Sequence, residues 1–140
     1  MAACTFFGHR DAPEYLDRQL KTVLIDLIRN QGVDVFYVGN NGRFDACAIR
    51  VLKDLETSFP IRFYIVLSSL PSEKGLNELD EHTILPEGLE TVPPRFRIDR
   101  RNHWMLDRSD FAVTYVRYPT GGAAKFKALA EQKRKRVVEV

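Results

Sequence analysis

Three short segments of the chain combine glycine with side chains that can bind an anion. The first is Gly8-His9-Arg10, and the second is Gly39-Asn40-Asn41-Gly42-Arg43, which is followed closely by Asp45. The third is Thr120-Gly121-Gly122. Glycine and asparagine tolerate the positive φ angles of tight turns with exposed backbone N–H groups, and arginine adds a full positive charge. The three segments therefore predict a binding site for an anion such as a phosphate group.

Each of these segments lies between an apolar run and a stretch with helical periodicity. Short, nearly continuous apolar runs predict buried strands, and apolar residues at helical spacing predict amphipathic helices. Strands are predicted over residues 4–7, 35–38, 62–67, 111–116 and 137–140. Helices are predicted over residues 13–31, about 46–58, 98–109 and 123–130.

This alternation predicts one domain over residues 1–140, with 44% apolar residues to form its core. We expect an α/β, Rossmann-like, doubly wound and mainly parallel five-stranded sheet with helices on both faces. Ligands of such sheets bind beyond the carboxyl ends of the strands, where the strand order reverses. The glycine segments should meet there in one crevice, within reach of Arg10, Arg43 and an arginine of the Arg100-Arg101 pair.

Two of these candidate side chains have a structural as well as a functional interpretation. His9 could contact the ligand or act as an acid or base, or it could be a structural hydrogen-bond donor in a turn. Asp45 could act on the ligand, or it could cap the helix beside it. The pattern of residues leaves both alternatives open.

Residues 68–97 lack a regular pattern and are rich in proline and acidic residues. We expect extended chain there, with at most a short helix around residues 76–79. A loop this long favours a cover over the site or part of an oligomer interface, and a simple surface insertion is the alternative. Arg100 and Arg101 lie near the start of the next predicted helix, where positive charge opposes the helix dipole. They indicate a function there, unless nearby aspartates and the acidic loop neutralise them.

Composition excludes several other classes of protein. Cys4 and Cys47 lie in apolar stretches without metal-ligand spacing, so we expect core residues, a reducing compartment, no metal and no cofactor. No leader pattern and no apolar run of about 20 residues is found, which predicts a cytoplasmic protein without a membrane partner. The net charge of +2 argues against nucleic acid. The basic run 133–136 complements the dipole of the preceding helix.

Five segments of the chain form a set of motifs: Cys4-Thr5-Phe6-Phe7-Gly8-His9-Arg10, Val38-Gly39-Asn40-Asn41-Gly42, Pro86-Glu87-Gly88-Leu89-Glu90, Arg101-Asn102-His103-Trp104-Met105 and Thr120-Gly121-Gly122-Ala123-Ala124. Taken together, these motifs resemble an uncharacterised bacterial family of the SLOG superfamily. That superfamily includes the DprA/Smf DNA-processing proteins, the YpsA-like proteins and the LOG phosphoribohydrolases, which release a base from a nucleoside monophosphate. The resemblance implies a Rossmann-like fold and a nucleotide or nucleotide-derived ligand.

The two motifs of the LOG enzymes are only partly present. Arg101 and Met105 match an Arg-Lys-x-x-Met motif, and Gly121 and Gly122 match a Pro-Gly-Gly-x-Gly-Thr-x-x-Glu motif. Ala128 replaces the glutamate, so the expected carboxylate is missing, and Arg101 and Asp45 remain as catalytic candidates. The further replacements are Asn102 for lysine, Thr120 for proline, and Ala124-Lys125 for Gly-Thr.

We therefore expect a protein that binds or senses a nucleotide-like small molecule. A nucleotide N-glycosidic hydrolase is the first alternative, and a DprA-like nucleic-acid-binding protein is the second. A homodimer or higher homo-oligomer is compatible with a small α/β domain of this kind. The predicted ligand-binding residues are Gly8, His9, Arg10, Gly39, Asn40, Asn41, Gly42, Arg43, Arg101, Thr120, Gly121 and Gly122.

Overall fold

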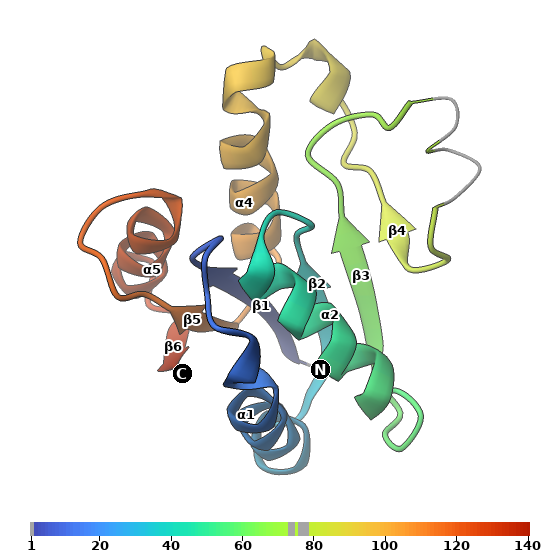
Figure 1. The fold of residues 1–140 in the computed structure, drawn as a ribbon, viewed down its shortest axis with the longest axis vertical. Coiled ribbons are helices and arrows are strands. Elements are labelled where there is room, and N and C mark those ends of the chain that lie inside the picture. The colour runs from blue at the N-terminus through green and yellow to red at the C-terminus, as the bar shows by residue number, and fades with distance from the viewer. Residues whose placement is uncertain (1, 73–74, 76–78) are drawn as a thin grey trace.

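The computed structural model describes residues 2–72, 75 and 79–140. In this part of the chain, six strands form one parallel sheet in the order β4-β3-β2-β1-β5-β6 (Figure 1). The order reverses at β1, which lies between β2 and β5. The strands are β1 (Ala2–Gly8), β2 (Val33–Val38), β3 (Arg62–Val66), β4 (Thr83–Ile84), β5 (Phe111–Tyr115) and β6 (Arg136–Glu139).

Helices pack on both faces of this sheet, as expected for a Rossmann-like α/β fold (Figure 1). Helices α1 (Asp17–Gln31) and α2 (Arg43–Leu55) cover one face, and α4 (Arg97–Asp107) and α5 (Gly122–Gln132) cover the other. Short 3₁₀ helices span Glu14–Leu16, Leu89–Thr91 and Pro94–Phe96.

Alternate residues of the central strand β1 pack into two hydrophobic cores, one on each face of the sheet. Cys4 and Phe6 of β1 pack with α1 and α2, whereas Phe7 packs with α4 and α5. Both faces of β1 are therefore buried, which explains why its sequence is apolar almost without interruption. Cys4 and Cys47 are free and buried, which confirms their prediction as core residues. Gly32 ends α1 with a φ of 69°, as its type predicts.

The prediction of five strands was one strand short. Strand β4 has only two residues and pairs with β3 alone, so it leaves almost no periodic pattern in the sequence. Its attachment depends on His82, which stacks on Phe63 at 4.0 Å and lies between the carboxylates of Asp80 and Glu56. Lys53 pairs with Asp80 at 2.7 Å and adds a second link to α2.

The described part of segment 68–97 contains β4 and two 3₁₀ helices. None of the residues 68–72, 75 and 79–97 lines the pocket described below. The short helix predicted around 76–79 falls mostly on residues 76–78, which lie outside the described residues. Among the helices of the described residues, none is long and apolar enough to cross a bilayer.

Candidate functional site

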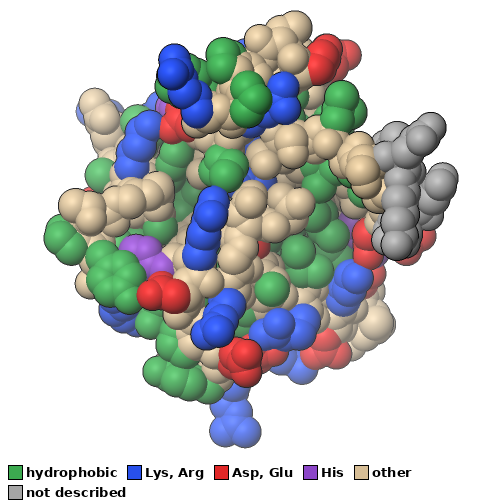
Figure 2. Space-filling model, turned by 45° about the horizontal axis from the view of Figure 1, so that its top comes forward, with side chains coloured by type: hydrophobic (Ala, Val, Ile, Leu, Met, Phe, Trp, Pro, Cys, Tyr) green, Lys and Arg blue, Asp and Glu red, His purple; other side chains and the backbone are tan. Residues whose placement is uncertain are grey.

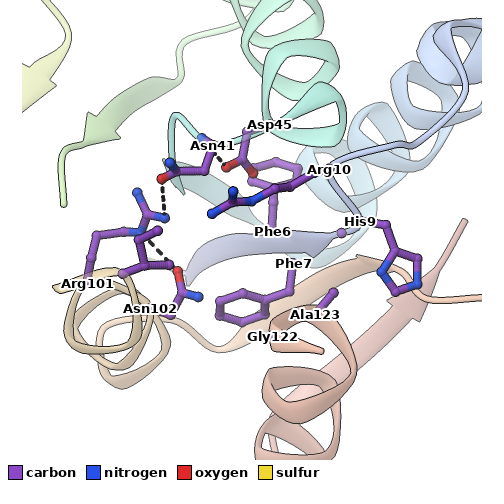
Figure 3. Close-up of a pocket in the computed structure, with 12 residues that line it drawn as sticks. Phe6, Phe7, His9, Arg10, Asn41, Asp45, Arg101, Asn102, Gly122 and Ala123 are labelled. Carbon is purple, nitrogen blue, oxygen red and sulfur yellow. Dashed lines mark hydrogen bonds between the residues drawn. The ribbon is translucent and has the colours of Figure 1, made fainter. Parts of the chain in front are cut away.

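A pocket of about 250 Å³ lies at the carboxyl end of β1, where the strand order reverses. Its walls come from β1 and the loop after it, from the turn between β2 and α2, and from α4 and the start of α5 (Figure 3). This is the position at which open α/β sheets bind their ligands. The lining residues are Phe6, Phe7, Gly8, His9, Arg10, Asn41, Asp45, Ile98, Arg101, Asn102, Gly122 and Ala123.

Arg101 is the most deeply buried charged group of this pocket, with only 2% of its surface exposed. Its guanidinium donates to Asn41 Oδ1 at 2.7 Å and to the Val66 carbonyl at 3.0 Å. It also donates to Asn102 Oδ1 at 2.9 Å and to Asn40 Oδ1 at 3.3 Å. All four acceptors are neutral, so the positive charge is held in place without being neutralised by direct ion pairing. Burial lowers the pKa of Arg101, although the nearby Asp45 carboxylate opposes this shift.

Arg10 provides a second guanidinium on the opposite side of the pocket. Figure 3 shows its side chain reaching into the pocket toward Arg101, above the ring of Phe7. The side chain is exposed, and within the described residues it makes no hydrogen bond. Its backbone carbonyl accepts the N–H of Arg43 at 2.9 Å, which fixes the loop after β1 against the turn after β2. The guanidinium of Arg10 therefore remains available for a ligand while its backbone is fixed.

Asp45 contributes a buried carboxylate with 7% of its surface exposed. Burial raises its pKa to about 6, although the Asn41 N–H and the charges of Arg101 and Arg10 oppose the shift. Its Oδ2 accepts the Asn41 N–H at 3.0 Å, whereas the N-cap of α2 is Gly42 and has no side-chain capping bond. The expected helix-capping role therefore takes another form, because Asp45 fixes the turn before the helix. A carboxyl group with a pKa near neutrality can also exchange a proton with a ligand.

His9 has a structural role that can be read from its partners. Its Nε2 accepts backbone N–H groups from Arg117 at 2.8 Å and from Tyr118 at 3.2 Å. An Nε2 atom that accepts two hydrogen bonds carries no proton, so the proton of a neutral ring lies on Nδ1. The structural alternative considered for His9 is thus observed, with the ring nitrogen as an acceptor rather than a donor. His9 ties the loop after β5 to the end of β1 while it lines the pocket.

The glycines of the three segments fall into two groups. A Cβ atom at Gly8 would lie 2.2 Å from the Phe44 ring, and one at Gly39 would lie 2.8 Å from the Arg101 guanidinium. Gly42 has a φ of 96°, and its Cβ would lie 2.5 Å from Arg10 Cα. By contrast, an added Cβ at Gly121 or Gly122 would have no atom of another part of the described chain within 4 Å. The first group permits close packing, and the second leaves the start of α5 open.

The start of α5 is the part of the pocket with the clearest space for an anion. Gly121 is the N-cap, with a φ of 97° and no side-chain capping bond. The first N–H groups of a helix have no partners within the helix, and its N-terminus carries partial positive charge. Gly122 and Ala123 from this turn line the pocket. An anion bound there would face the same space as Arg10.

The structure brings together seven of the predicted residues and leaves others outside the pocket. Arg43 and Thr120 are exposed and do not line it, so the expectation that the Arg43 side chain reaches the crevice is not met. Its backbone N–H, not its charge, contributes to the site. The predicted residues in the lining are Gly8, His9, Arg10, Asn41, Asp45, Arg101 and Gly122. Those beside it that position others are Gly39, Asn40, Gly42 and Gly121.

Five lining residues were not predicted: Phe6, Phe7, Ile98, Asn102 and Ala123. Three of them, Phe7, Asn102 and Ala123, directly adjoin a predicted site residue in the sequence, which was the available indication for them. The aspartates expected to neutralise Arg100 and Arg101 have other partners. Asp99 pairs with Lys125 and His103, and Asp107 pairs with Lys133.

Charge on the surrounding surface is dispersed. Figure 2, which turns the upper end of Figure 1 toward the reader, shows Lys and Arg side chains spread among uncharged ones. They do not form one continuous basic strip on this face. The concentration of positive charge is therefore a local property of the pocket.

Comparison with known proteins identifies a relative in fold. Neither a scan against protein-family models nor a search of curated proteins found a match. Among solved structures, the chain is similar to DNA processing protein A from Helicobacter pylori, whose structure was described for its single-stranded DNA binding mode. The TM-score is 0.65 at 15% sequence identity, over 99% of this chain and 64% of that one. The chain thus spans less than two thirds of that structure, and the two share a Rossmann-like α/β fold.

Proposed function

We propose that this protein belongs to the SLOG superfamily and binds a nucleotide or nucleotide-derived phosphorylated small molecule in the pocket beside β1. The observation that carries the proposal is the combination of two guanidinium groups with an open helix N-terminus around one cavity. Arg10 and Arg101 lie on opposite sides of it, and the uncapped start of α5 forms another wall. Asp45 is the single carboxylate among the lining residues of this pocket.

The expected interactions are strong enough for useful affinity. A hydrogen bond to a charged group contributes about 1.5–3 kcal/mol, and a helix terminus contributes about 0.3–1 kcal/mol. A micromolar dissociation constant corresponds to about 8 kcal/mol. Several such contacts to a phosphate, supplemented by contacts to a sugar, reach this range. Fixed acceptors around Arg101 reduce the entropy lost on binding, because its side chain is already ordered.

A thermal-shift panel tests the proposal directly. Nucleoside mono-, di- and triphosphates, dinucleotides and ADP-ribose are added to the wild type, to Arg10→Ala and to Arg43→Ala. A ligand at about 100 times its dissociation constant stabilises the folded protein by about 2.7 kcal/mol, which corresponds to a shift of a few degrees. We expect a shift that Arg10→Ala reduces and Arg43→Ala retains. Arg43 is a matched control, since it lies in a neighbouring turn but outside the pocket. Absence of a shift with every compound would contradict the proposal.

Hydrolysis of an N-glycosidic bond is a second candidate function, favoured by Asp45. This carboxyl is buried in the pocket and has a pKa raised to about 6, which suits proton transfer near neutral pH. It could take the role of the LOG-motif glutamate, at whose position this chain has Ala128. Release of free base from a bound nucleoside monophosphate, lost in Asp45→Asn, would support a hydrolase. Binding without product would support a sensor.

Nucleic-acid binding is a third candidate, and the structural comparison favours it more than composition does. The net charge of +2 argued against a nucleic-acid partner, but the similar Helicobacter pylori protein binds single-stranded DNA. A pocket that accepts a nucleotide can also accept one unit of a strand. Fluorescence anisotropy with a labelled single-stranded oligonucleotide tests this function. Affinity that falls steeply with salt would support it, because released counterions drive such binding.

A further inference from the structure

Tyr118 combines a large exposed surface with a fixed orientation. It is 51% exposed, yet its ring packs in a tilted arrangement against the His9 ring, with a centroid distance of 4.4 Å and an interplanar angle of 34°. Its hydroxyl donates to Asp11 Oδ2 at 2.9 Å, and its backbone N–H donates to His9 Nε2 at 3.2 Å. An exposed aromatic ring normally keeps rotational freedom. Here the packing against His9 and the hydroxyl hydrogen bond to Asp11 orient the ring.

The position of this ring relates it to the pocket. The Tyr118 ring contacts His9, a residue that lines the pocket, and Tyr118 lies three residues before Gly121, the N-cap of α5. The ring is therefore separated from the pocket by a single lining residue, His9. The backbone hydrogen bond to His9 does not itself require tyrosine, because the N–H of any residue except proline could donate it.

The size of the pocket provides a second argument. Sites that enclose a drug-sized ligand measure roughly 300–1,000 Å³, whereas this pocket measures about 250 Å³. Its polar groups, Arg10, Asp45 and Arg101, suit a phosphate and a hydroxyl-bearing sugar. A whole nucleotide would extend past the rim, and its base would need an apolar surface outside the cavity.

We propose that the base of the bound nucleotide stacks on the exposed face of Tyr118. This inference rests on the proposed function and adds to it a subsite for the base. Bases stack on aromatic side chains regardless of their hydrogen-bonding edges. The ordered ring loses little freedom on binding, so most of the stacking energy is retained as affinity. Asp11 and His9 are positioning residues for the ring.

Calorimetric titration with two ligands tests the inference. The ligands are AMP and ribose 5-phosphate, which share the sugar and the phosphate but differ in the base. Tyr118→Ala should weaken the binding of AMP by about 5- to 100-fold, the range that corresponds to loss of one base-stacking contact. It should leave the affinity for ribose 5-phosphate within about twofold, because the base alone contacts the ring. Tyr118→Phe should bind AMP much more tightly than Tyr118→Ala, since it keeps the ring and its packing against His9 and loses only the hydroxyl bond to Asp11.

The control variant is Tyr15→Ala, which removes a tyrosine that is 78% exposed and does not line the pocket. It should bind both ligands like the wild type. The stacking inference alone would be overturned if Tyr118→Ala bound AMP as tightly as the wild type. It would also be overturned if the variant lost affinity for AMP and ribose 5-phosphate to the same extent. If the wild type bound neither ligand, the proposed function would fail and the base subsite with it. Far-UV circular dichroism confirms that each variant is folded before titration.

Discussion

On the α2 side of the pocket the glycines are enclosed by other groups, whereas on the α5 side they face open space. Gly8, Gly39 and Gly42 each have another side chain or backbone where a Cβ would stand. Among the residues that the structure describes, Gly121 and Gly122 have no such group within 4 Å. Both groups follow strands and precede helices, and both contain the same residue type.

The difference shows that glycine serves two purposes at one edge of the sheet. On the α2 side it allows two loops and the Arg101 guanidinium to pack closely, which fixes the charged groups of the pocket. On the α5 side it keeps the helix N-terminus accessible. One side is rigid and determines where the charges lie, and the other is open and can receive an anion. Substitutions on the two sides should therefore affect different properties.

The largest effect is expected for Gly42→Ala on the enclosed side. The new Cβ would meet Arg10 Cα at 2.5 Å at a residue with a φ of 96°. Overpacking and the unfavourable φ together should lower the free energy of unfolding by about 3–4 kcal/mol. Urea denaturation monitored by circular dichroism measures the change. A loss below about 1 kcal/mol would show that the two loops can move apart freely, and that glycine on the α2 side is not needed for close packing.

A slightly smaller effect is expected for Asp45→Asn, and it depends on pH. The folded protein raises the pKa of Asp45 from 3.8 to about 6, so protonation is favoured by folding. The stabilising contribution is complete below pH 3.8 and is lost as the pH rises to about 6 and above. An asparagine side chain does not ionise, so the variant should gain about 2–3 kcal/mol relative to wild type between about pH 4 and pH 7. Denaturation of both proteins across this range checks the sign, with exposed Asp54→Asn as the control.

Gly122→Ala tests the open side. Since nothing lies within 4 Å of the added Cβ, the free energy of unfolding should change by less than about 0.5 kcal/mol. The methyl group would nevertheless partly cover the start of α5. Affinity for the ligand found in the thermal-shift panel should fall about two- to fivefold, which corresponds to a weakened interaction with one helix terminus. Unchanged affinity would place the anion elsewhere in the pocket.

The smallest effect is expected for His82→Gln. Because His82 lies outside the pocket, this variant is a reference for the pH dependence that comes from Asp45. Burial lowers its pKa, but hydrogen bonds to Asp80 and Glu56 outweigh this and raise the pKa above 6.5. Its contribution to stability is thus complete below pH 6.5 and is lost at higher pH. His82→Gln should remove the part of the pH dependence above pH 6.5 and leave the part below about pH 6 that belongs to Asp45. Denaturation curves at about pH 5.5, 7 and 8.5 distinguish the two windows.

Much of the fold was predictable, because its main strands and helices are long enough to show their periods. The five predicted strands correspond to β1, β2, β3, β5 and β6, and the turns after them lie at one edge, as parallel topology requires. Strand β4 was missed because two residues cannot show an alternating pattern. Its pairing depends on contacts of His82 with Asp80 and Glu56. Glu56 is distant from His82 in the sequence, and aspartate is depleted in strands, so neither contact gives a strand signal.

The site was predictable in place but not in detail. Arg10 and Arg43 have the same sequence context, a glycine turn before a helix, yet only Arg10 enters the pocket. The direction of a side chain in a turn depends on the packing of neighbouring loops, which local sequence does not reveal. Gly8 was expected to contact a ligand, and although it lines the pocket, its lack of a Cβ is explained by the Phe44 ring. The burial of Arg101 depends on Asn40 and Asn41 from a different element.

The two-residue strand β4 has a consequence for association between molecules. Without it, β3 would be the outer strand and would present its free N–H and C=O groups along an aromatic and branched sequence, Arg62–Val66. Such an edge can pair with the same edge of another molecule and begin aggregation. The Ile65 and Leu67 N–H groups are instead bonded to His82 and Ile84 carbonyls at 3.0 Å. The short strand therefore covers the Ile65–Val66 part of the β3 edge, which could otherwise pair with a strand of another molecule.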